Sequence, residues 1–91
     1  MALVKYYRSE DGRADFKFIF QPELDYIAVY CLQTPSLQGR DPSPLKTHLL
    51  TSNKICFAEG REPRTQERAE ELAKQWAEYL LEYIRTGRPQ I

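Results

Sequence analysis

Hydrophobic and polar positions alternate along the first third of the chain, a pattern typical of β-strands with one buried face. Within residues 14–20, three phenylalanines occupy every second position, Phe16, Phe18 and Phe20, so their side chains are expected on one face. Residues 3–8 read as a preceding strand. The Asp11-Gly12 pair between the two stretches favours a tight turn, because glycine readily adopts positive φ.

A third strand is expected over residues 26–32, after a polar break that contains Pro22. Because this stretch is apolar on both faces, we expect it to be the central strand. Residues 34–44 contain three prolines and one glycine and are expected to form a loop. Residues 47–50 are expected to be a short extended stretch, and residues 54–58 a last short strand.

The last third of the chain has the repeat of an amphipathic helix over about residues 65–86. Its apolar residues recur at spacings of three and four and form one stripe, Ala69, Leu72, Ala73, Trp76, Leu80, Tyr83 and Ile84. Thr65 can cap the start of the helix, and Gly87 suits the position after its last turn. We expect Trp76 in the core, whereas Tyr79 and Leu81 lie away from the centre of the stripe, and one of the two is expected on a contact surface.

These elements predict an α+β fold, an antiparallel β-meander of three to five strands packed against one long C-terminal α-helix. Ninety-one residues suit a single domain, 1–91, with strands over about residues 3–58 and the helix over about 65–86. A chain of this length buries a modest core, which aromatic side chains help to fill.

Charge and hydropathy argue against two classes of partner. Thirteen Lys and Arg residues balance thirteen Asp and Glu residues, whereas a dedicated nucleic-acid binder normally has a basic excess. No apolar run approaches the roughly 20 residues that a membrane-spanning helix needs, and the N-terminus lacks the features of a signal peptide. We therefore expect a cytoplasmic protein that does not bind a membrane and is not a dedicated nucleic-acid binder.

The two cysteines, Cys31 and Cys56, lie in apolar stretches and are expected to be free thiols in a reducing compartment. Together with a single histidine they cannot supply the usual four protein ligands of a structural zinc ion, and no cofactor is indicated. Cys31 is expected in the core. Cys56, between Ile55 and Phe57, also fits a small buried side chain when it is considered alone.

One stretch has a pattern that suggests chemistry, His48-Leu-Leu-Thr-Ser-Asn-Lys-Ile-Cys56-Phe. A histidine precedes a polar turn, and a cysteine follows within an apolar triplet. Several residues of the C-terminal helix complete the pattern, Trp76, Glu78, Tyr79, Leu80, Tyr83 and Gly87. In this order the residues between about 14 and 89 resemble the E2-like domains of bacterial ubiquitin-type conjugation systems.

The resemblance implies an activity and a set of site residues. Cys56 would carry a modifier protein as a thioester, and His48 would orient the loop through its backbone or favour the thiolate. The oxyanion would depend on backbone N–H groups between Asn53 and Cys56, with Asn53 as a third site residue. An activating enzyme and a ubiquitin-like modifier would be the partners. Four features depart from the pattern. Leu49 and Leu50 replace the Pro-Asn pair of eukaryotic relatives, and no helix precedes the strands. Glu62 stands where a tryptophan usually precedes the proline, and Arg88 and Pro89 replace the aromatic residue usually seen after Gly87.

Two other functions fit the same residues. The first is a small non-catalytic protein–protein interaction module of the same fold, such as a phage or defence-associated binding protein, with an unknown protein partner. The second is double-stranded RNA binding, which strands followed by a helix after the basic segment at residues 61–64 would permit. The neutral net charge of the chain and the absence of a leading helix argue against the RNA-binding alternative.

Overall fold

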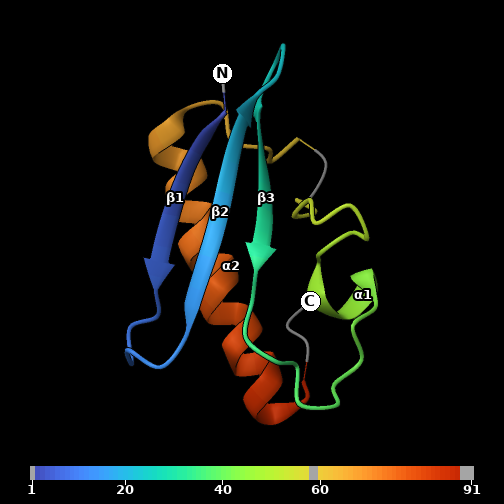
Figure 1. Ribbon diagram of the computed structural model, residues 1–91. Coiled ribbons are helices and arrows are strands. Elements are labelled where there is room, and N and C mark those ends of the chain that lie inside the picture. The colour runs from blue at the N-terminus through green and yellow to red at the C-terminus, as the bar shows by residue number, and fades with distance from the viewer. Residues whose placement is uncertain (1, 58–59, 89–91) are drawn as a thin grey trace.

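A computed structural model describes residues 2–57 and 60–88. Three strands, β1 (Leu3–Arg8), β2 (Asp15–Pro22) and β3 (Ile27–Gln33), precede a short helix, α1 (Pro44–Thr47), and a long helix, α2 (Gln66–Thr86). Figure 1 shows the three strands side by side with α2 crossing behind them. The predicted α+β class, with an antiparallel sheet and a C-terminal helix, is confirmed.

The sheet is an antiparallel meander in the order β1-β2-β3, so β2 is the central strand. The expectation that residues 26–32 form the central strand is therefore wrong. The physical reason lies on the outer edge of β3, which other segments cover. Cys31 N–H donates to Asn53 O at 2.8 Å, Ile55 N–H donates to Val29 O at 2.8 Å, and Ile27 N–H donates to Pro63 O at 2.8 Å.

Two shorter predictions between the strands and α2 also need correction. Thr47 ends α1 rather than opening an extended stretch, and only Leu49 of residues 47–50 forms a β-bridge, with Ile55. Residues 54–57 are not a full strand: Lys54 and Ile55 each form an isolated bridge. Ala58 lies outside the described residues. Local hydrogen bonds of a turn, described below, replace the ladder that a strand would need.

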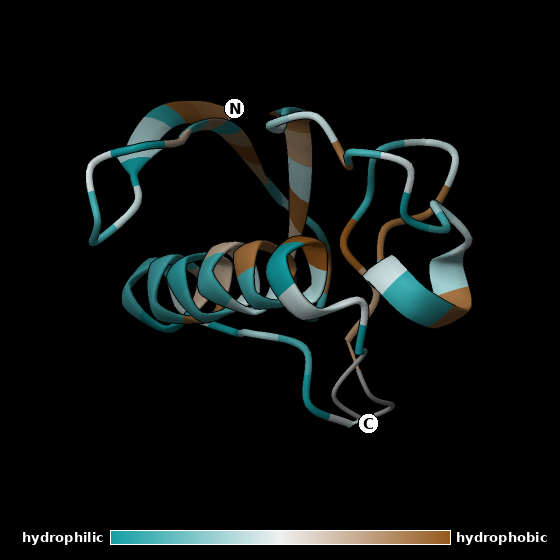
Figure 2. Cartoon of the chain, turned by 90° about the horizontal axis from the view of Figure 1, so that it is seen from below, coloured by the Kyte–Doolittle hydropathy of each residue, from teal (hydrophilic) through white to brown (hydrophobic). Residues whose placement is uncertain are grey.

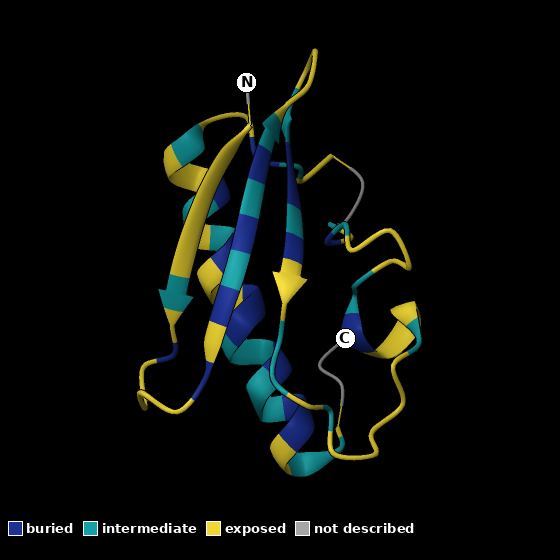
Figure 3. Ribbon diagram, in the orientation of Figure 1, coloured by how far each residue is buried: buried dark blue, intermediate teal, exposed yellow. Residues whose placement is uncertain are grey.

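The core lies between the sheet and α2. The three alternating phenylalanines of β2 are all buried on the helix side, as predicted. Trp76 of α2 is 6% exposed and meets Phe16 and Phe18 edge-on, with ring centroids 6.2 Å apart in both pairs. Figure 3 shows the buried residues concentrated on β2, β3 and the facing side of α2. Burial of these aromatic side chains is the main source of stability.

Both predicted ends of α2 are confirmed. The Thr65 side chain accepts a hydrogen bond from Arg68 N at 3.1 Å, which satisfies one of the unpaired N–H groups of the first turn. Gly87 follows the last turn with φ of 73° and donates its N–H to Tyr83 O at 2.6 Å. Arg40 adds a hydrogen bond from Nε to Ile84 O at 3.0 Å, so the end of the helix is held from the loop.

Polar contacts attach the edge strand β1 to the helix. Lys5 Nζ lies 3.1 Å from Glu70 Oε1, and Tyr7 OH donates to Glu78 Oε2 at 2.6 Å. Partial burial of Tyr7, assisted by its bond to Glu78 and the negative charge of that carboxylate, raises the pKa of the tyrosine to about 12. These contacts supplement the modest apolar burial of a strand whose side chains are mostly exposed.

Candidate active site

The two cysteines occupy opposite environments. Cys31 is 1% exposed on β3, and its Sγ donates to Gln33 O at 3.3 Å. Burial raises the pKa of the Cys31 thiol to about 11, so it is a neutral core group at ordinary pH. Cys56 is exposed. The prediction that Cys31 belongs to the core is confirmed, and the alternative that Cys56 is a core side chain is wrong.

Alternation along the chain explains why Cys56 faces solvent. Ile55 is 2% exposed and belongs to the core, so the side chain that follows it in an extended backbone points away from the core. Lys54 bridges to Tyr30 and Ile55 to Leu49, which fixes this segment between β3 and the residues before it. Cys56 is therefore held at the surface by its buried neighbour.

A narrow antiparallel turn brings His48 opposite Cys56. Cys56 N–H donates to His48 O at 2.7 Å, and Leu50 N–H donates to Lys54 O at 2.9 Å. The turn closes through Asn53 N–H, which donates to Leu50 O at 2.8 Å, and Asn53 adopts a positive φ of 70° that asparagine tolerates better than most residues. The separation of eight residues in sequence thus becomes a direct backbone contact.

His48 and Cys56 line the same open surface hollow, which has a volume of about 360 Å³. Its floor and the facing wall come largely from α2, through Leu72, Gln75, Trp76 and Tyr79, with Ile55 and Phe57 beside the cysteine. The ring of Tyr79 lies 5.4 Å from that of His48, centroid to centroid. A thiol, an imidazole and three aromatic rings, those of Phe57, Trp76 and Tyr79, therefore share one accessible surface.

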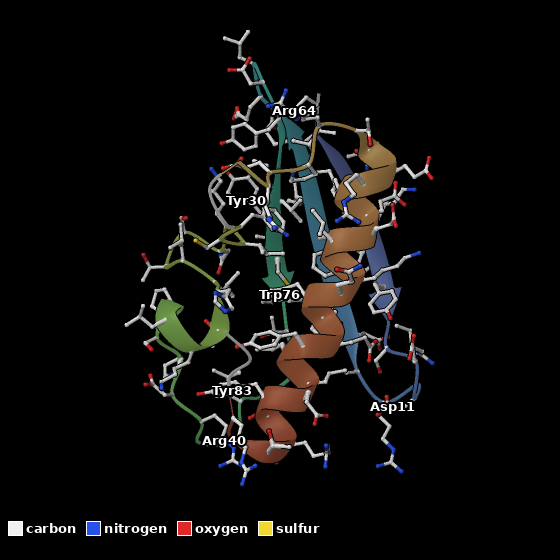
Figure 4. The ribbon with its side chains drawn as sticks, turned by 180° about the vertical axis from the view of Figure 1, so that it is seen from behind. Asp11, Tyr30, Arg40, Arg64, Trp76 and Tyr83 are labelled. Atoms are coloured by element: carbon white, nitrogen blue, oxygen red, sulfur yellow. The ribbon has the colours of Figure 1, made fainter. Side chains whose placement is uncertain are left out.

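Side chains of α2 hold the segment that leads into His48. Trp76 Nε1 donates to Thr47 O at 2.9 Å, Tyr83 OH donates to Asp41 O at 2.8 Å, and Tyr79 OH donates to Lys46 O. Figure 4 shows Trp76 and Tyr83 on one side of α2, with Arg40 near its C-terminal end. Figure 2, a view from below, shows α1 beside α2 rather than on the opposite face of the sheet.

Asn53 does not join this hollow. Its residue is exposed at the tip of the turn, and its carbonyl oxygen is occupied by Cys31 N–H. Three of the four expected oxyanion donors are also committed, because the N–H groups of Asn53, Ile55 and Cys56 all donate within the fold. The structure brings together His48 and Cys56 of the three predicted site residues and leaves Asn53 with the structural task of closing the turn.

A second hollow of about 350 Å³ lies on the other side of Cys56. Tyr26, Leu50, Lys54 and Glu62 contribute to its lining. Lys54 Nζ donates to Tyr26 OH at 2.8 Å, and this hydrogen bond raises the pKa of the lysine, which keeps a positive charge near the cysteine segment. The exposed Cys56 thus lines both hollows, the aromatic one that contains His48 and the more polar one that contains Lys54.

Tyr79 and Lys54 were not predicted as parts of the site. Tyr79 lies off the centre of the apolar stripe, which marked it only as a possible surface residue. A sequence feature that could have identified Tyr79 is the series of aromatic hydrogen-bond donors at helical spacing, Trp76, Tyr79 and Tyr83. Aromatic donors that are buried need acceptors. Which carbonyls they would meet depends on the path of the loop, which the sequence pattern does not specify.

Within residues 2–57 and 60–88, no three His, Cys, Asp or Glu side chains lie close enough together to hold a metal ion. No helix in the same described part of the chain is long and apolar enough to cross a membrane.

Comparisons with protein-family models, with curated proteins and with solved structures found no match for this chain.

Proposed function

We propose that the chain is a small E2-like conjugation protein that carries a modifier protein as a thioester on Cys56. The observation that carries the proposal is the exposure of Cys56 in a hollow that it shares with His48, while Cys31 is buried. An acyl-carrying cysteine must be reachable by a partner's thioester, and only an accessible thiol meets that requirement.

The reaction is two successive acyl transfers. The Cys56 thiolate attacks the carbonyl carbon of a thioester on an activating enzyme, a new C–S bond forms, and the donor's C–S bond breaks with release of the donor thiolate. In the second transfer an amine nitrogen attacks the same carbonyl carbon. The amine loses a proton as the C–N bond forms, and the Cys56 thiolate leaves and is available for another cycle.

His48 has two tasks in this proposal. Its carbonyl oxygen holds Cys56 N–H at 2.7 Å and so fixes the backbone on which the thiol stands. Its imidazole lines the same hollow as the thiol and is the candidate to donate a hydrogen bond to the oxyanion, since the backbone N–H groups of Asn53, Ile55 and Cys56 are used within the fold. The partners are an activating enzyme and a ubiquitin-like modifier.

A synthetic acyl donor tests the proposal without a known partner. A peptide ending in a Gly-Gly thioester of mercaptoethanesulfonate is incubated with the folded protein, and adducts are located by mass spectrometry. We expect a dithiothreitol-labile adduct on Cys56, none on Cys31, and loss of the labile adduct in Cys56→Ser. Cys31→Ser is the matched control and should still form it. An unmodified Cys56 in the folded wild type would contradict the proposal.

The exposed face of the sheet favours a second candidate function, a non-catalytic protein–protein interaction module. Val4, Tyr6 and Leu32 are 45%, 72% and 47% exposed. The register places Val4 opposite Ile19 and Tyr6 opposite Lys17, on the face away from the buried phenylalanines. Within the described residues α2 covers only the other face (Figure 1). An interaction module would keep its partner in Cys56→Ser and lose it in Tyr6→Ala.

A further inference from the structure

We infer that Tyr79 is a positioning residue. It holds the segment at the end of α1, residues 46–48, so that His48 stays aligned with Cys56. The inference rests on the proposed function and deepens it by adding a residue to the same site. Tyr79 contacts this segment through its hydroxyl group and through its ring. Its hydroxyl donates to Lys46 O, and its ring lies 5.4 Å from the His48 ring at an interplanar angle of 50°.

The backbone at His48 needs such support. His48 has φ of 57° and ψ of 25°, a left-handed conformation that is unfavourable for a residue with a Cβ. A residue stays in this conformation only when its surroundings fix it. Here His48 N–H donates to Pro44 O at 2.9 Å, and His48 O accepts from Cys56 N–H. Tyr79 and Trp76 bond the two carbonyls that precede it, Lys46 O and Thr47 O.

Tyr79 differs from its neighbours on α2 in touching both the backbone of the turn and the imidazole. Trp76 bonds Thr47 O from within the core, where it also supports the phenylalanines. Tyr83 bonds Asp41 O, seven residues before His48, and does not line the hollow around Cys56. Tyr79 lines that hollow together with His48 and Cys56. Its side chain therefore adds a contact with the His48 ring to the backbone link that Trp76 makes from α2.

Tyr79→Phe and Tyr83→Phe are matched variants, because each removes one hydroxyl that donates to a loop carbonyl and keeps the ring. The first readout is the rate of Cys56 alkylation by iodoacetamide from pH 5 to 10, with the modified cysteine assigned by mass spectrometry. The second is the nuclear magnetic resonance spectrum of the imidazole. His48 is the only histidine in the chain, so its ring signals need no further assignment.

For Tyr79→Phe we expect the His48 ring signals to move and Cys56 alkylation near neutral pH to change by a factor of about five, the typical worth of one hydrogen bond. For Tyr83→Phe we expect both readouts to match the wild type. Equal effects of the two variants, or no effect of Tyr79→Phe, would overturn the inference.

A double-mutant cycle separates positioning from a general loss of stability. His48→Asn removes the imidazole and keeps a residue that accepts the left-handed conformation. If Tyr79 acts through His48, Tyr79→Phe has no further effect on Cys56 alkylation in the His48→Asn background. A full effect in that background would refute the positioning role. None of these measurements needs a modifier protein. They can therefore refute the role of Tyr79 independently of the peptide-thioester experiment, which tests the proposed function.

Discussion

The indole Nε1–H of Trp76 donates a hydrogen bond of 2.9 Å to the carbonyl oxygen of Thr47. The same ring is 6% exposed and packs against two phenylalanines of β2. One side chain therefore joins the sheet, the long helix and the short helix that ends beside His48. The core and the candidate site are connected through this residue.

Trp76→Phe should destabilise the protein by about 2–3 kcal/mol, because it shrinks a buried ring and leaves Thr47 O without its donor. The free energy of unfolding, measured by urea denaturation with far-ultraviolet circular dichroism, checks this value. Leu81→Ala, at a partly buried position on the same helix, is the control and should cost less. A loss below about 1 kcal/mol would show that the hydrogen bond and ring packing contribute little.

Thr65→Ala should cost about 1 kcal/mol, since the Thr65 oxygen no longer accepts the N–H of Arg68 in the first turn of α2. Thr65→Ser keeps that oxygen and should stay close to the wild type. Urea midpoints of the three proteins give the comparison. If alanine and serine behaved alike, the capping hydrogen bond would not contribute to stability.

Gly87→Ala should destabilise by about 1 kcal/mol, because an L-residue with a Cβ disfavours the φ of 73° at this position. The new Cβ would also lie 2.7 Å from Arg40 Nη1, so the guanidinium would have to move away from the helix end. Thermal unfolding of Gly87→Ala in the wild type and in Arg40→Ala separates the two causes. Equal losses in both backgrounds would mean that the close approach to Arg40 costs nothing.

The buried thiol predicts a loss of stability at alkaline pH. The pKa of Cys31 rises from 9.0 to about 11 on folding, so the folded state keeps a proton that the unfolded state loses first. The corresponding contribution is fully present below pH 9 and is lost as the pH rises through about 11, by about 3 kcal/mol in all.

Cys31→Val, which replaces the thiol by a somewhat larger apolar side chain that does not titrate, should remove this part of the pH dependence. Tyr7, with a raised pKa of about 12, gives its own loss above pH 10 in both proteins, so the difference between them isolates Cys31. Urea denaturation at intervals from pH 8 to 11 is the measurement. Parallel stability curves for the wild type and Cys31→Val would exclude the thiol as the source.

Much of the fold follows from local patterns in the chain. The alternation of Phe16 with Phe18 and Phe20 gives the buried face of β2, and Thr65 and Gly87 mark the ends of α2. Such features need only near neighbours in sequence, and the periodicity of the strands and the helix reports them directly.

The segment between β3 and α2 could not be predicted in the same way. Its conformation depends on distant partners, such as Trp76 for Thr47 O and Val29 O for Ile55 N–H. The mistaken central position of β3 has a similar cause. Its apolar residues are covered by Ile55 and Pro63 rather than by another full strand. For the site, the order of His48 and Cys56 was informative, whereas the placement of Asn53 and Tyr79 required the fold.

The order of elements along the chain also bears on synthesis. The phenylalanines of β2 are made early, and the helix that covers them, Gln66–Thr86, is made late. Until α2 leaves the ribosome, the apolar face of the meander has no cover and the turn at His48 lacks its donors from Trp76 and Tyr79. The apolar side chains of the strand segments therefore stay exposed for several seconds at ordinary elongation rates, which favours aggregation. The core and the candidate site therefore both depend on α2, the last of the elements to be synthesised.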